Sequence, residues 1–138
     1  MNDALWLFAS TPKWFLLNSF NIRAGALDAI PTLGVVALLI GFVLAAMRRA
    51  WRLIAFLVPF FASQLLLILA GLARGRVAAG TADTILYGFL ALQLVVVSIL
   101  VWRFRDVRLA AVALALFSLC YAVFAGFVST NAMANSWL

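Results

Sequence analysis

The chain has 138 residues, of which 68% are apolar and only 10% are charged. Soluble domains carry about 25% charged residues, so this composition excludes a soluble globular fold and indicates an integral membrane protein. The formal net charge is +6. Because the cations lie between apolar runs, we attribute them to membrane topology, and we predict no nucleic-acid partner.

The residue types that carry most catalytic and metal chemistry are missing. The chain has no His and no Glu, and its one Cys is Cys120. This excludes haem ligation by His, the common zinc ligand sets and His-based acid–base catalysis within the chain. We therefore predict that the protein is not an enzyme and that it has no catalytic, metal or cofactor-binding residues. Bound lipid is the one non-protein component that we expect.

Residues 1–27 differ in pattern from the rest of the chain. Ser10–Pro12 has the features of a helix start, with a hydroxyl N-cap and Pro at the first helical position. Pro12 and Lys13 interrupt an otherwise apolar stretch, so a fifth membrane span is the less favoured interpretation. We predict an amphipathic interfacial helix that lies on the membrane. Its residues expected to insert into the membrane are Trp6, Trp14 and Phe15.

Residues 28–138 contain four apolar runs without charged side chains. Each is close to the length of about 20 residues that crosses a hydrocarbon core about 30 Å thick. Short connections join the first run to the second and the third to the fourth, which forces antiparallel neighbours. We predict an all-α fold, a four-transmembrane-helix antiparallel bundle preceded by the interfacial helix. The predicted spans are 31–47, 53–73, 84–102 and 109–129.

Orientation follows from the distribution of charge. The hairpins 48–52 and 103–108 together carry a net charge of +5, against +1 for the cations and aspartates assigned to the other face, Lys13 among them. The positive-inside rule then places both hairpins in the cytoplasm and both termini outside. Heavy use of Ala and Arg favours a bacterial inner membrane. The predicted interfacial anchors are Trp51 and Trp102 inside, and Trp6, Trp14 and Trp137 outside.

The arginines of the two hairpins have two interpretations. Cations after the C-terminal ends of helices suit the helix dipole and fix topology. The same side chains could also hold an anionic lipid head group or a partner protein, since each cation near anionic lipid gains about 1 kcal/mol. The candidate residues for such a site are Arg48, Arg49, Arg52, Arg103, Arg105 and Arg108.

The four aspartates are the only acidic side chains. Each lies near the start of a predicted helix, where a carboxylate caps free backbone N–H groups. We therefore interpret all four as helix caps, since they are assigned to different membrane faces. They are Asp3, Asp28, Asp83 and Asp106.

Polar side chains recur near the middle of the predicted spans. In hydrocarbon such groups need partners, so they should point at other helices. The favoured interpretation is a neutral hydrogen-bonded layer that fixes helix register; the alternative is a polar constriction that lines a small pore. Cys120 is expected to be a buried small residue. The candidate polar layer consists of Ser63, Gln64, Gln93, Ser118 and Tyr121.

Helix packing is also predicted from small residues and from one proline. Stripes of small residues let helix backbones approach closely. Pro59 should bend the second span, because it removes a backbone donor. The first span carries Ala37, Gly41 and Ala45 in one stripe, and the fourth carries Ala111, Ala115, Ser118, Ala122 and Gly126.

Two functions remain after these exclusions. The favoured one is a non-catalytic polytopic subunit or scaffold of a larger membrane protein assembly. Its support is the missing catalytic chemistry together with 12 Phe, 5 Trp and 2 Tyr, which provide wide apolar surfaces. The alternative is a small oligomeric channel or facilitator that uses the neutral polar layer. The expected partners are membrane lipids and either other membrane subunits or further copies of this chain.

The predicted orientation can be tested by cysteine labelling from outside the cell. A Cys placed at Ser136 should react with an impermeant maleimide, and one placed at Arg105 should react only after the membrane is opened. The natural chain serves as the control, because Cys120 is expected to stay unlabelled. Equal labelling of both positions in intact cells would refute this orientation.

Overall fold

The computed structural model describes residues 2–19 and 26–135, and all regular structure in these two ranges is helical. Two short 3-10 helices, Trp51–Phe56 and Arg105–Val107, precede the third and fifth α-helices. The α-helices are α1 (Asn2–Asn18), α2 (Ala26–Met47), α3 (Leu57–Leu72), α4 (Ala79–Arg103) and α5 (Arg108–Ala134).

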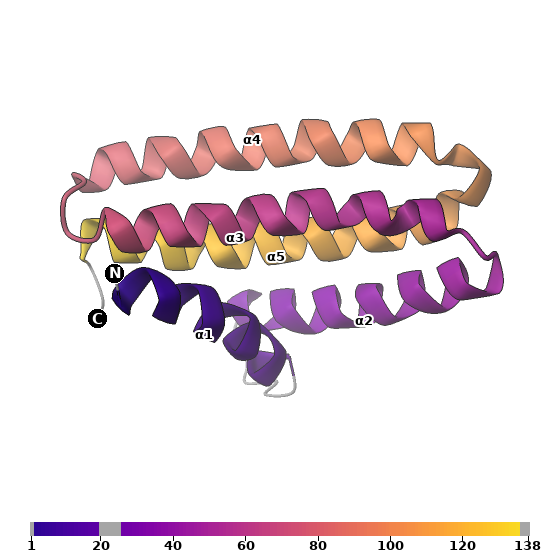
Figure 1. Ribbon diagram of the computed structural model, residues 1–138, viewed down its shortest axis with the longest axis horizontal. Coiled ribbons are helices and arrows are strands. Elements are labelled where there is room, and N and C mark those ends of the chain that lie inside the picture. The colour runs from indigo at the N-terminus through magenta and orange to yellow at the C-terminus, as the bar shows by residue number, and fades with distance from the viewer. Residues whose placement is uncertain (1, 20–25, 136–138) are drawn as a thin grey trace.

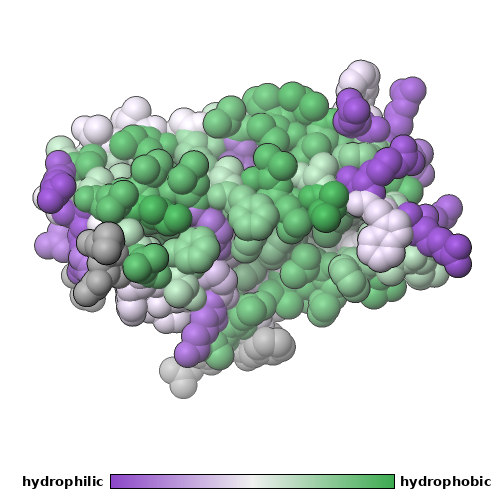
Figure 2. Space-filling model, in the orientation of Figure 1, coloured by the Kyte–Doolittle hydropathy of each residue, from purple (hydrophilic) through white to green (hydrophobic). Residues whose placement is uncertain are grey.

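Four of the helical segments are long and apolar enough to cross a membrane. Their first and last residues lie close to those of the predicted spans. Helix α5 continues beyond the predicted end of the fourth span, to Ala134. The chain runs back and forth along the long axis, and the turns α2–α3 and α4–α5 lie at the same end (Figure 1). Figure 2 shows an apolar middle with hydrophilic residues gathered towards both ends, as expected for an integral membrane protein.

Helix α5 lies at the centre of the arrangement and contacts α1, α2, α3 and α4. The small-residue stripe expected on this span is buried along its whole length, from Ala111 to Gly126. A Cβ atom added at Gly126 would overlap Leu86 of α4, and one added at Gly41 of α2 would overlap Leu114 of α5. The small residues therefore allow the surrounding helices to reach the central one.

Pro59 lies close to a boundary between two kinds of helix. The chain is a 3-10 helix up to Phe56 and becomes α-helical at Leu57, so Pro59 is the third residue of α3. This position falls in the first turn of the α-helix, where proline is tolerated. The winding changes from 3-10 to α-helical just before Pro59, and the bend of this span stays a prediction.

The N-terminal segment departs from the prediction in its local structure. The helix does not start at Ser10–Pro12, because α1 is continuous from Asn2 to Asn18 with Pro12 inside it. A proline in a helix interior costs about 3 kcal/mol. Packing offsets this cost, since one face of α1 is buried against the bundle. The buried residues on this face are Ala4, Leu7, Thr11 and Phe15.

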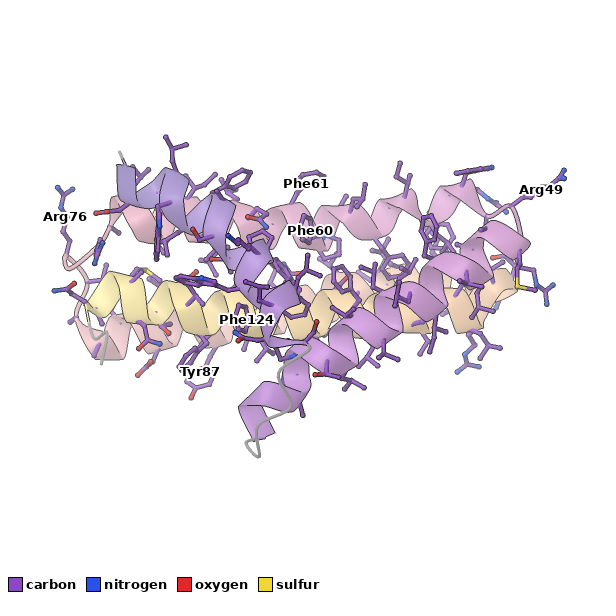
Figure 3. All side chains as sticks on the ribbon, turned by 90° about the horizontal axis from the view of Figure 1, so that it is seen from below. Arg49, Phe60, Phe61, Arg76, Tyr87 and Phe124 are labelled. Carbon is purple, nitrogen blue, oxygen red and sulfur yellow. The ribbon has the colours of Figure 1, made fainter. Side chains whose placement is uncertain are left out.

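The path of α1 is oblique to the other helices. It starts at the end of the bundle where α3 ends and runs towards the middle (Figures 1 and 3). Phe15, expected to insert into the membrane, instead points into the protein and has its ring centroid 5.1 Å from that of Tyr121. The helix therefore packs as part of the protein body along its buried face.

Two of the four aspartates form ion pairs, and this role is clearer in the structure than the predicted role as helix caps. Asp3 lies in the first turn of α1 and pairs with Arg74 at 3.2 Å, and Asp106 pairs with Arg52 at 3.3 Å. Asp83 is not an N-cap, because α4 begins four residues before it, with Ala78 as the N-cap residue. The side chain of Asp28 lies outside the described residues. Both ion pairs are exposed, so each contributes at most about 1 kcal/mol.

The contact between α1 and α3 can be tested at Gly71. A Cβ atom there would overlap the backbone of Ala4, so Gly71→Ala should push α1 away and destabilise the protein by about 1–3 kcal/mol. Thermal unfolding in mild detergent measures this effect. Gly88→Ala is the matched control, because nothing lies within 4 Å of a Cβ at Gly88. An unchanged melting temperature for Gly71→Ala would contradict the packing of α1.

Candidate functional site

The middle of the bundle contains a hydrogen bond between two of the predicted polar residues. Gln64 of α3 donates from Nε2 to the hydroxyl of Tyr121 of α5. Both side chains are buried, with 4% and 1% of their surface exposed. The bond ties α3 to the central helix at the depth where a polar group in hydrocarbon has no water to bind.

Gln93 does not join this pair. Its Nε2 donates to the main-chain oxygen of Pro59 at 3.0 Å, which links α4 to α3. The same oxygen accepts from the hydroxyl of Ser63, also at 3.0 Å. Ser118 donates to Leu114 within its own helix at 2.9 Å. The predicted layer is therefore divided into one Gln64–Tyr121 pair, one group around Pro59 and a separate Ser118.

An aromatic cluster surrounds Tyr121. The rings of Phe15 and Phe60 lie with centroids 5.1 and 4.8 Å from that of Tyr121, and Phe124 lies 5.4 Å from Phe15. Phe117 contacts three of these rings. Figure 3 shows Phe60 and Phe124 in the inner part of the molecule, between ends marked by Arg49 and Arg76. These contacts place aromatic side chains next to the polar pair on three helices.

Sequence reasoning missed this cluster, although part of its signal was present. Phe117, Tyr121 and Phe124 recur at spacings of four and three, which places them on one face of a helix. Their partners come from α1 and α3, and nothing local to either segment indicates that pairing. Part of the aromatic content expected on the surface thus lies inside the protein.

Three buried polar atoms have no hydrogen-bond partner within the described residues: Thr11 Oγ1, Gln64 Oε1 and Ser129 Oγ. Thr11 follows Ala4 by seven residues, and Gln64 precedes Gly71 by seven in the opposing helix. Ala4 and Gly71 are in contact, so Thr11 and Gln64 each lie about two helical turns from the same contact between α1 and α3. Two of the three atoms thus belong to α1 and α3, which contact each other, and the third belongs to α5.

The six arginines of the two hairpins lie at one end of the bundle, and they are not equivalent. Arg52 pairs with Asp106. Arg105 and Arg108 line an open groove of about 510 Å³ between α4 and α5, together with Trp102. Arg48, Arg49 and Arg103 are exposed and do not line it. The structure therefore singles out two of the six candidate arginines as part of a concave surface.

The predicted tryptophan anchors are distributed as follows. Trp51 and Trp102 lie at the arginine end with 83% and 74% of their surface exposed. Trp6 and Trp14 lie on α1 and contact each other edge to face, with centroids 4.8 Å apart. Trp137 lies outside the described residues. The exposed rings at the arginine end are where interfacial anchors are expected.

Comparisons with protein-family models, with curated proteins and with solved structures find no match.

The Gln64–Tyr121 bond can be measured by a double-mutant cycle. Gln64→Leu should leave the Tyr121 hydroxyl without its partner and destabilise the protein by about 1–3 kcal/mol. Adding Tyr121→Phe removes both ends of the bond and should recover most of that loss. Equilibrium unfolding in detergent or bicelles provides the free energies. Additive losses in the double variant would show that the two groups do not interact.

Gln93→Leu serves as the comparison, because the oxygen of Pro59 keeps its bond from Ser63. We expect a loss near the average of about 0.6 kcal/mol for hydrogen bonds between membrane helices.

Proposed function

We propose that this protein is a non-catalytic polytopic subunit or scaffold of a larger membrane assembly. In this proposal its four spans form an antiparallel bundle in a bacterial inner membrane. The hairpins 48–52 and 103–108 face the cytoplasm, and both termini lie outside. Helix α1 enters the outer leaflet at an angle from the outer interface.

The observation that carries the proposal is the position of Lys13. The topology prediction counts it with the outer cations, but it follows Ala4 by nine residues, about 13 Å along a helix that runs towards the middle of the bundle. Its side chain is exposed, and it makes no ion pair with any residue in the described ranges. A lysine in hydrocarbon costs about 2.5–3.5 kcal/mol, so such residues pair with other groups or reach an interface.

A neighbouring subunit would supply the missing group. A carboxylate or a main-chain carbonyl on a partner helix could accept from the Lys13 ammonium and remove this cost. The outer surface of α4 is compatible with the same proposal. Within the described structure α4 buries Ala82, Gln93 and Val97, and its other sides present apolar side chains to lipid or to a partner.

A small oligomeric channel is the second candidate. Its support is the set of buried polar atoms without partners, above all Thr11 Oγ1 and Gln64 Oε1 on the facing helices α1 and α3. Such atoms have hydrogen-bonding capacity to offer to a water molecule or to a small solute. The aromatic cluster favours the subunit proposal, because its rings pack around Tyr121, the hydrogen-bond partner of Gln64.

Purification at native expression levels in a mild detergent tests the proposal. The natural chain should retain an unrelated membrane protein in a fixed stoichiometric ratio. Lys13→Met should lose most of that partner, because the partner's polar group would face a methyl group, whereas Lys13→Arg should retain it. Arg76→Met is the control, since Arg76 is an exposed cation at the outer end (Figure 3).

The possible results are distinct. Loss of the partner in Lys13→Met alone supports a subunit with Lys13 at the interface. Recovery of further copies of this chain alone would favour the channel. A monomer from the natural chain, without any protein partner, would refute the subunit proposal.

A further inference from the structure

The groove between α4 and α5 has walls and a mouth of different chemistry. Its walls are apolar and include Leu94 and Val97 of α4 and Leu119 of α5. Its mouth carries Arg105, Arg108 and the ring of Trp102. A volume of about 510 Å³ falls within the range of about 300–1,000 Å³ typical of small-molecule sites.

The charge at the mouth is not neutralised by the protein. The neighbouring carboxylate, Asp106, is paired with Arg52 at 3.3 Å. Arg105 and Arg108 are exposed and form no ion pair in the part of the chain that the structure describes. The mouth therefore presents two guanidinium groups, which match the geometry of a phosphate.

The depth of the groove matches one leaflet of a membrane. Leu119 follows Arg108 by eleven residues in α5, which is about 16 Å at 1.5 Å per residue. Half of a hydrocarbon core is about 15 Å thick. A ligand with its anionic group at the arginines would thus have its apolar part in contact with the walls down to the bilayer centre.

We propose that this groove binds one anionic phospholipid of the arginine-side leaflet. Arg105 and Arg108 hold the phosphate, Trp102 lies beside the head group, and one acyl chain follows the apolar walls. The charge complementarity at the mouth distinguishes this occupant from a neutral lipid or an apolar helix. The proposal requires only that the helices span a bilayer, and it is independent of any protein partner at Lys13.

Native mass spectrometry of the purified full chain tests the site, with phosphatidylglycerol and phosphatidylcholine titrated in parallel. The natural chain should bind the first phosphatidylglycerol more tightly than phosphatidylcholine. Arg105→Gln with Arg108→Gln should weaken that affinity roughly 5- to 30-fold, as expected from the gain per cation near anionic lipid. Arg48→Gln with Arg49→Gln removes the same charge from the same end, outside the groove, and should change the affinity less than twofold.

A second variant tests the walls while keeping both cations. Ser98 lines the groove and is exposed, so Ser98→Phe fills the space without disturbing the core. This variant should lower the affinity for the first phosphatidylglycerol at least fivefold and leave the melting temperature unchanged. Equal weakening by the two arginine pairs would show general electrostatic attraction and refute the site. An unchanged phosphatidylglycerol affinity in Ser98→Phe would refute the site as well.

Discussion

The close approach of four helices to α5 is the constraint on which the rest of the structure depends. A helix can have neighbours on several sides only if its own side chains leave room for them, and α5 meets this condition with Ala, Ser and Gly at most of its buried positions. Where the spacing is tightest, Gly126 faces Leu86 and Gly41 faces Leu114. An added Cβ at Gly41 would meet both the side chain and the backbone of Leu114, whereas at Gly126 it would meet the end of the Leu86 side chain, which would have to turn away.

Tyr121 is the largest buried side chain on this helix, and it joins the elements that the small residues bring close. Its hydroxyl accepts from Gln64, and its ring contacts Phe15 and Phe60. One residue therefore connects α1, α3 and α5 at mid-height through both apolar and polar contacts. Gln93 connects α4 separately, through the oxygen of Pro59. The polar groups of the interior serve two different helix contacts and do not form a single layer.

The sequence was sufficient to predict the helical class, the four apolar spans and the burial of the stripe on α5. These follow from run length, charge position and residue size, which are properties local to each segment. The course of α1 could not be predicted in this way. The Ser10–Pro12 pattern indicated a helix start, but the contacts of Phe15 and Ala4 with distant helices outweigh that local preference.

In the candidate sites too, the sequence indicates which residues matter but not which partners they take. Gln64, Gln93 and Tyr121 were recognisable as groups that need partners, because each lies within an apolar run. Which partner each one takes depends on helix register, and that is set by packing between segments. The groove beside Arg105 and Arg108 likewise requires the relative placement of α4 and α5. Without that placement, the sequence alone could not show which of the six hairpin arginines line the groove.

Helix α5 comes after the four helices that it contacts, and this affects the order of assembly. During synthesis α1 to α4 are made before α5 is available, so Gln64 and Phe15 lack their contacts with Tyr121 until α5 has been made. Contacts between segments far apart in sequence form slowly, because the loop between them must be closed first. We therefore expect the earlier helices to remain incompletely packed until α5 joins them.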